Sequence, residues 1–202
     1  MTPGPLLLFA PGAGAASTSP WMRAWAARLA DLGAVAPFDY PYRLAGRKLP
    51  DRHDVLVAAH REALARARAA DPGRPVVLIG KSMGGRIGCH VAHEEPDVGA
   101  LVCLGYPLRP VGGGPPRDAV LLALRTPVLF VQGTRDRLCP LDELARVRAR
   151  MAAPSALHVV EGGDHDLALA RRDAAARGVT QAQADAAALA AVAAFLRAHA
   201  AR

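Results

Sequence analysis

The chain has 202 residues, of which 51% are hydrophobic and 21% are charged, enough to build a buried core, and we expect one domain over residues 1–202. Its net charge of +7 comes almost entirely from arginine, because Lys48 and Lys81 are the only lysines. The arginines are spread along helix-like segments without interleaved aromatic residues, a pattern typical of solvated helix faces. We therefore exclude nucleic acid as a partner.

Cysteine usage and apolar run lengths bear on the compartment. Cys89, Cys103 and Cys139 are odd in number and lack C-x-x-C spacing, which predicts free thiols in a reducing compartment. The apolar run at residues 6–10 is too short for a signal peptide, and no uncharged apolar segment reaches membrane-spanning length. We expect a cytoplasmic monomer or homodimer that does not bind membranes.

Six short, mainly apolar runs predict the strands of a parallel sheet, and the third of them has no polar alternation, as expected of a strand that is buried on both faces. In chain order they cover residues 6–9, 34–42, 76–79, 100–104, 127–131 and 156–160. The second run contains Pro37 and Pro41, which cannot donate ladder hydrogen bonds, so we expect that strand at a sheet edge.

Segments with helical spacing lie between and after these strands, at residues 20–32, 51–70, 85–93, 118–124, 141–151 and 180–198. Ser19 precedes Pro20 as a predicted N-cap, and Thr180 with Gln183 forms a predicted capping box. The alternation predicts an α/β three-layer sandwich around a mainly parallel six-stranded sheet with right-handed crossovers. Residues 109–116, rich in glycine and proline, are expected to be irregular.

The pentapeptide Gly80-Lys81-Ser82-Met83-Gly84 lies between the third predicted strand and a helix start and fits G-x-S-x-G. In that motif the serine occupies a strained turn, and the flanking glycines let the backbone pass close on either side. Serine between glycines is also an ordinary turn composition, so the motif needs partners.

Those partners are found at two other strand ends. Asp136 follows the fifth predicted strand and His165 the sixth, and side chains at the carboxyl ends of parallel strands meet at one edge of the sheet. The chain order Ser82, Asp136, His165 is the triad order of an α/β hydrolase and differs from both triad orders known in unrelated serine proteases. His165 would accept the serine proton, and Asp136 would orient the imidazole.

A tetrahedral intermediate also needs backbone donors. We expect them to be the N–H of Met83, directly after the serine, and that of Ala13 in the glycine-rich loop at residues 10–14, with Gly14 as the alternative. The substrate-pocket candidates are Gly14, Tyr106, Leu108 and Leu138.

Several residues have simpler interpretations. Asp164 and Asp166 flank His165 and compete with Asp136 as its partner, although adjacent side chains tend to point apart, and Asp136 could merely cap the following helix. The remaining histidines are assigned no role: His53, His60, His90, His93, His158 and His199. No metal-ligand spacing is present, and Ser17 stands where a G-x-G-x-x-G motif needs glycine, so we expect no metal and no cofactor.

With these residues in place, the chain resembles the α/β-hydrolase family over nearly its whole length. More narrowly, it resembles the small dienelactone-hydrolase-like predicted hydrolases related to a subunit of a eukaryotic histone-acetyltransferase complex. The stretches that carry the resemblance are residues 11–14, 80–86, 105–108, 132–136 and 162–165. The resemblance implies a serine hydrolase fold with Ser82, Asp136 and His165 as its triad.

The sequence departs from the family in two ways. Pro11 stands where many relatives carry histidine before the oxyanion glycine. The chain also begins at the family's third strand, which predicts the strand order 4-3-5-6-7-8 in family numbering and leaves residues 34–42 at the edge. We expect no cap domain and an open pocket covered only by residues 109–116.

The expected activity is hydrolysis of a small ester or thioester through an acyl-enzyme. The alternative is a non-catalytic hydrolase-fold protein-interaction module, because a fold does not determine a function.

Overall fold

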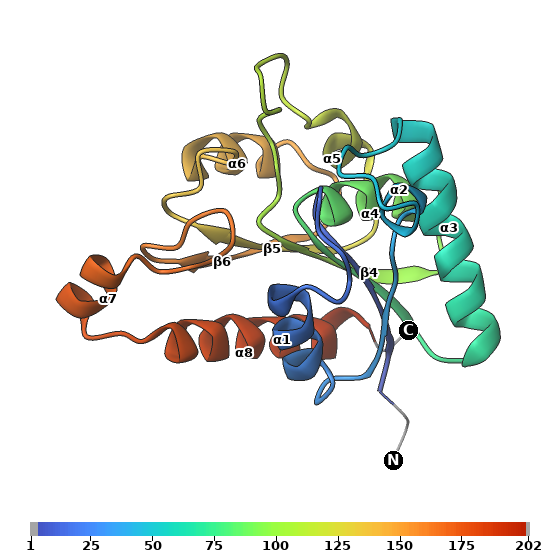
Figure 1. The fold of residues 1–202 in the computed structure, drawn as a ribbon, viewed down its shortest axis with the longest axis horizontal. Coiled ribbons are helices and arrows are strands. Elements are labelled where there is room, and N and C mark those ends of the chain that lie inside the picture. The colour runs from blue at the N-terminus through green and yellow to red at the C-terminus, as the bar shows by residue number, and fades with distance from the viewer. Residues whose placement is uncertain (1–3, 201–202) are drawn as a thin grey trace.

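The computed structural model describes residues 4–200, and their framework is one six-stranded sheet in which every strand pairing is parallel. The strands are β1 (Leu6–Ala10), β2 (Ala34–Pro37), β3 (Val76–Lys81), β4 (Val98–Leu104), β5 (Val128–Gly133) and β6 (Ser155–Val160). Their spatial order is β2-β1-β3-β4-β5-β6 (Figure 1). This is the order that the family resemblance implies, and β2 lies at an edge as its prolines predicted.

Helices cover both faces of the sheet (Figure 1). They are α1 (Pro20–Leu29), α2 (Pro41–Leu44), α3 (His53–Ala70), α4 (Met83–Glu94), α5 (Ala119–Ala123), α6 (Leu141–Arg148), α7 (Arg171–Arg177) and α8 (Gln181–His199). Helices α1 and α8 pack on one face, and α3, α4, α5 and α6 lie on the other. The expected α/β three-layer sandwich is confirmed, and the described residues contain no cap domain.

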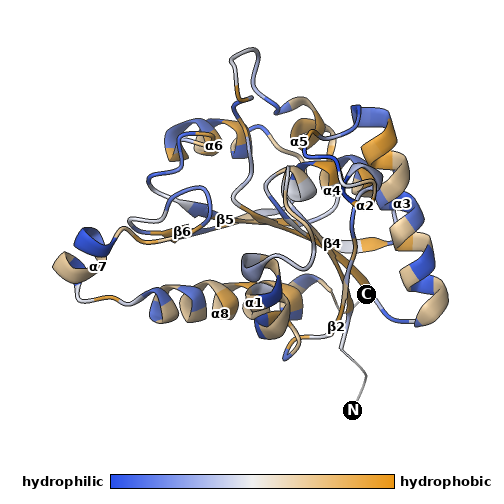
Figure 2. Cartoon of the chain, viewed as in Figure 1, coloured by the Kyte–Doolittle hydropathy of each residue, from blue (hydrophilic) through white to orange (hydrophobic). Residues whose placement is uncertain are grey.

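Side chains on successive strand residues point to opposite faces, so both faces carry apolar residues, and much of the sheet is orange in Figure 2. The face under α1 and α8 buries Leu7, Phe9, Val77, Ile79, Val102, Leu129 and Val131. The opposite face buries Leu6, Leu8, Val76, Leu78, Leu101, Val128 and Phe130. Each fully buried leucine or phenylalanine contributes about 1.5–3 kcal/mol to folding.

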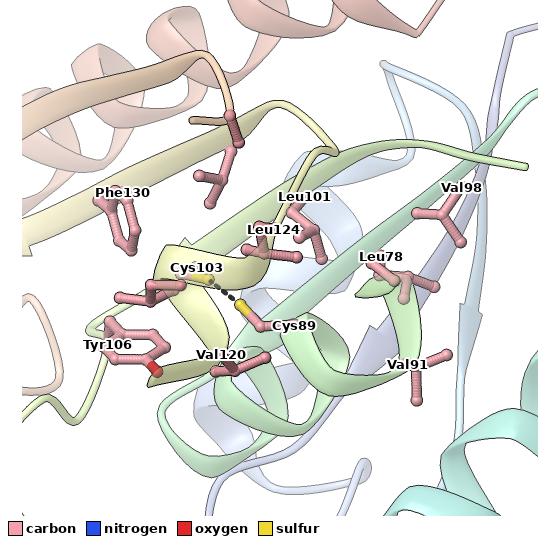
Figure 3. Packing of buried hydrophobic residues seen from close by; sticks show 14 of the residues in the cluster. Leu78, Cys89, Val91, Val98, Leu101, Cys103, Tyr106, Val120, Leu124 and Phe130 are labelled. Carbon is pink, nitrogen blue, oxygen red and sulfur yellow. Dashed lines mark hydrogen bonds between the residues drawn. The ribbon is translucent and has the colours of Figure 1, made fainter. Parts of the chain in front are cut away.

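All three cysteines are free and buried in the second of these clusters. Figure 3 shows Cys89 of α4 facing Cys103 of β4, with Sγ atoms 3.8 Å apart. Both thiols act as small apolar residues between the helix and the sheet.

Three predicted boundaries were wrong by three residues or more. Strand β2 ends at Pro37, not at residue 42, because the chain then leaves the sheet and Pro41 begins the short helix α2, where a missing N–H costs nothing. Helices α1 and α6 end three residues earlier than expected. Helix α7 was not predicted, although Gly178 in the left-handed conformation at its end is a typical stop signal.

No single helix within residues 4–200 is both long and apolar enough to cross a bilayer. Helices α7 and α8 meet that composition only when they are joined across a bend of 80°. Helix α8 buries Val192 and Phe195 against the sheet.

Candidate active site

Ser82 lies at the turn between β3 and α4 in a conformation that non-glycine residues rarely adopt, with φ 49° and ψ −115°. The neighbouring glycines make this turn possible. A Cβ on Gly84 would lie 2.5 Å from the carbonyl oxygen of Ala10, and one on Gly80 would overlap the backbone of Gly85. Only glycine at both positions lets β3, the turn and the loop after β1 approach this closely.

The structure brings the three strand-end residues together across 83 residues of sequence. His165 Nε2 lies 2.8 Å from Ser82 Oγ, and His165 Nδ1 lies 2.7 Å from Asp136 Oδ2. Because the Asp136 carboxylate accepts from Nδ1–H, Nε2 is left with a lone pair directed at the serine hydroxyl. The Asp136 side chain is fully buried, whereas 27% of the His165 side chain is exposed.

Two further groups hold the Asp136 carboxylate. The amide Nε2 of Gln132 donates to Oδ2, and the backbone N–H of Leu138 donates to Oδ1 at 2.8 Å. Gln132 is itself fixed, since its Oε1 accepts from the Tyr106 N–H at 3.0 Å. Sequence reasoning missed Gln132, whose signal was a lone amide at the end of an otherwise apolar strand.

The loop after β1 supplies the candidate oxyanion donors. Gly12 lies beside the serine, since a Cβ built on it would be 3.6 Å from Ser82 Cβ. The N–H of Gly14 donates to the Tyr42 hydroxyl at 3.1 Å, so the alternative donor is already engaged. The N–H groups of Ala13 and Met83 have no hydrogen-bond partner within residues 4–200.

A family model described as an alpha/beta hydrolase domain matches residues 3–197. The chain belongs to the α/β-hydrolase family. Its sheet order and the strand-end placement of Ser82, Asp136 and His165 are those expected from the resemblance.

Solved structures share this fold. A dienelactone hydrolase from Anabaena variabilis is 18% identical, with 98% of this chain and 88% of that chain covered and a TM-score of 0.70. The esterase domain of a Rhodothermus marinus protein is 19% identical, with 98% and 89% covered and a TM-score of 0.69. An alpha-beta serine hydrolase homologue from Coxiella burnetii is 19% identical, with 80% and 76% covered and a TM-score of 0.67.

A cavity of about 420 Å³ in this α/β hydrolase opens beside Ser82 and His165. Its walls are largely apolar and include Trp21, Met22, Val111 and Leu138, together with residues of the loop after β1. Of these, sequence reasoning had named Leu138 as a pocket residue and Ala13 as an oxyanion donor, and Val111 belongs to the stretch 109–116 that was expected to cover the pocket. A larger cavity of about 740 Å³ lies near the amino ends of β4 and β5, away from the serine, and contains none of the three residues.

Three predicted pocket residues do not line the cavity. Gly14 is turned toward Tyr42, and Tyr106 and Leu108 are fully buried in the core under α4 and α5. The reason is Gly105, whose φ of +69° turns the chain inward after β4, so that the Tyr106 hydroxyl donates to the Arg117 carbonyl at 2.7 Å.

The carboxylates that flank His165 in the sequence are engaged elsewhere. Asp164 Oδ1 accepts from the N–H groups of Asp166 and Ala168, and Asp166 Oδ1 lies 3.1 Å from Lys81 Nζ. Burial lowers the pKa of Lys81, and the Asp166 carboxylate opposes that shift. Sequence reasoning did not single out Lys81, because a lysine at the variable position of G-x-S-x-G carries no local signal.

Within residues 4–200, the other titratable groups do not join the hydrogen-bond series of Ser82, His165 and Asp136. No cluster of three metal-ligating side chains occurs within residues 4–200. Burial raises the pKa of the Cys139 thiol to about 12, which leaves that thiol protonated and a poor nucleophile at neutral pH. His60 is fully buried against Tyr40 and lies outside the site.

Proposed function

We propose that this α/β hydrolase is a serine hydrolase that cleaves a small carboxylic ester or thioester through an acyl-enzyme. The observation that carries the proposal is the unbroken hydrogen-bond series from Ser82 Oγ through both ring nitrogens of His165 to the buried carboxylate of Asp136. A hydroxyl is activated as a nucleophile when a base with a free lone pair lies within hydrogen-bond reach.

In the first half-reaction, His165 Nε2 takes the Ser82 proton while Oγ attacks the substrate carbonyl carbon. The N–H groups of Met83 and Ala13 donate to the oxyanion, and Asp136 stabilises the imidazolium. The imidazolium then gives its proton to the leaving oxygen or sulfur, the C–O or C–S bond breaks, and the acyl group stays on Oγ.

In the second half-reaction, His165 takes a proton from water, whose oxygen attacks the acyl carbon. Collapse of the second tetrahedral intermediate releases the carboxylic acid and returns the proton to Ser82. Each residue ends as it began, so the reaction consumes one water per ester and needs no cofactor.

The site's shape supports a small substrate. A cavity of about 420 Å³ with mainly apolar walls accommodates a short acyl or aryl group. From the sequence features described above, we also propose that the protein belongs to the dienelactone-hydrolase-like branch, that it is cytoplasmic, and that it is a monomer or a homodimer.

A fluorophosphonate probe tests the proposal without knowledge of the natural substrate. The wild type is expected to be labelled and Ser82→Ala to remain unlabelled, while Cys139→Ala, which removes a nearby thiol, is expected to label like the wild type. Turnover of p-nitrophenyl acetate and butyrate should follow the same pattern. Equal labelling of wild type and Ser82→Ala would refute the proposal, and absence of both labelling and turnover would favour the protein-interaction module.

A further inference from the structure

Lys81 is a buried cation directly before the candidate nucleophile. Only 7% of its side chain is exposed, and its Nζ donates to the main-chain carbonyl of His165 at 2.6 Å. The same ammonium pairs with the Asp166 carboxylate at 3.1 Å and lies 5.7 Å from the centre of the Trp21 ring. Nothing in the triad mechanism above uses this group.

The loop that Lys81 contacts carries His165 and has an unusual backbone. Leu167 has φ +63°, and Leu167 and Ser82 are the two non-glycine residues with positive φ within residues 4–200. Such a conformation is unfavourable for a residue with a side chain and persists only where surrounding contacts hold it. The loop therefore requires restraints from outside itself.

Two side chains from outside the loop hold the adjacent main-chain carbonyls of His165 and Asp166. Lys81 Nζ holds the carbonyl of His165, and Trp21 Nε1 donates to the carbonyl of Asp166 at 2.9 Å. Lys81 comes from β3 and Trp21 from α1, so two separate elements hold successive peptide units next to the imidazole. Asp164 closes the loop from within, by accepting from two of its N–H groups.

The ammonium is also close to the imidazole. A Cβ built on Gly105 would lie 3.4 Å from Lys81 Nζ and 3.5 Å from His165 Nδ1, so both nitrogens border the same small space. The other charged groups facing Lys81 are the carboxylates of Asp166, Asp164 and Asp136. Lys81 therefore balances acidic groups that surround the base.

A cation at this position is costly as a structural element. Removing an ammonium from water carries a large desolvation penalty, whereas an apolar side chain on β3 would carry none. The remaining buried residues of this strand are apolar or glycine. Packing alone therefore does not explain the choice of lysine.

We propose that Lys81 is a positioning residue of the site, which fixes the main chain of His165 and, together with Asp166, sets the charge beside the imidazole. This inference rests on the proposed function, since it assigns Lys81 a role in activating Ser82. The ion pair has a direct consequence for pH dependence, because the base works only while it is neutral.

The test compares Lys81→Met, which keeps the aliphatic stem but removes the charge, with Lys48→Met, which changes the chain's only other lysine. The rate constant for fluorophosphonate labelling and kcat for p-nitrophenyl acetate are expected to fall about 10- to 100-fold in Lys81→Met, with KM changed less than about twofold. Lys48→Met should match the wild type, and Lys81→Arg should recover part of the loss.

The pH–rate profile separates positioning from mere stability. Loss of the cation in Lys81→Met favours the protonated imidazole and should move the acid limb to higher pH. Asp166→Asn leaves the cation uncompensated and should move the same limb to lower pH. Opposite displacements by the two variants are the expected signature, and circular dichroism checks that each variant is folded.

Each outcome decides the question. A folded Lys81→Met with wild-type labelling rate and acid limb would overturn the role of Lys81 while leaving the serine hydrolase intact. If Lys81→Met does not fold, Asp166→Asn decides, and an unmoved acid limb there overturns the proposal. A wild type that resists labelling would instead remove the proposed function, and this inference with it.

Discussion

Ser82 is half-buried and directs its hydroxyl at His165 from a backbone conformation that is unfavourable for a residue with a side chain. Its φ of 49° and ψ of −115° belong to a region that glycine populates readily and other residues do not. The turn is held because β3 and α4 are both buried on either side of it. Strain at this residue is the structural cost of directing Oγ at His165.

That strain can be measured by comparing two variants that both lack the hydroxyl. Ser82→Gly should be more stable than Ser82→Ala by about 1 kcal/mol, because glycine relieves the strain while alanine keeps a Cβ in the same conformation. Chemical denaturation of both variants provides the measurement. Equal stabilities would mean that the turn stores no strain.

His60 is a second residue whose environment works against its charged form. It is fully buried with its Nδ1 at 3.1 Å from the Tyr40 hydroxyl, and burial lowers its pKa to about 3. In the unfolded chain the same histidine titrates near 6.5. Below that pH the unfolded state binds a proton that the folded state does not.

The free energy of unfolding should therefore decrease as the pH falls below about 6.5, by up to about 1.4 kcal/mol per pH unit from His60 alone. Denaturation of wild type and His60→Phe between pH 7 and 5 tests this, and the variant should have the shallower dependence. His93→Gln, which changes an exposed histidine, should keep the wild-type slope. Parallel curves for wild type and His60→Phe would contradict the prediction.

At the scale of elements, the loop after β1 depends on the segment after β2. Asp39 accepts from the N–H of Ser17 at 2.6 Å and from its hydroxyl at 2.9 Å, and Tyr42 accepts from Gly14. The departure of the chain from the sheet after Pro37 is what brings both side chains to the loop. The shortened edge strand thus places the candidate oxyanion donor.

Tyr42→Phe removes one of these bonds and should lower kcat about tenfold with little change in KM, because a looser loop aligns the Ala13 N–H less well with the oxyanion. Steady-state kinetics with p-nitrophenyl acetate provides the measurement. Tyr40→Phe is the control, since that hydroxyl faces His60. A rise in KM alone would assign Tyr42 to substrate binding.

In the molecule as a whole, the site lies at the carboxyl ends of the parallel strands, and few residues cover it. The residues that the structure describes include no cap, and the glycine-rich stretch at 109–116 contributes Val111 to the cavity wall while 80% of this valine stays exposed. When an apolar ligand binds in the cavity, an exposed apolar side chain beside it becomes buried, and this burial favours binding.

Val111→Asp should raise KM for p-nitrophenyl butyrate several-fold and leave Tm unchanged, because the residue supports no core. The control is Val179→Asp, which changes a valine on the connection between α7 and α8. Unchanged KM in Val111→Asp would show that bound substrate does not reach this residue.

Strands and helices were largely predictable, because burial leaves an apolar pattern in every segment that crosses the core. Prediction failed where that pattern was missing or misleading. Helix α7 buries no side chain and so has no apolar pattern, whereas residues 38–42 are rich in aromatic residues and proline but leave the sheet. In both places tertiary contacts, not the local pattern, determine the backbone.

Glycine spacing, prolines and apolar runs act locally, so they were enough to predict the edge strand, the serine turn and the three residues at strand ends. Contacts between distant segments determine that Asp136 faces His165 while Asp166 turns to Lys81, and that Tyr106 and Leu108 point into the core. Lys81 and His165 are 84 residues apart. Contacts between loops that far apart depend on how the whole sheet places them, and no local pattern encodes that placement.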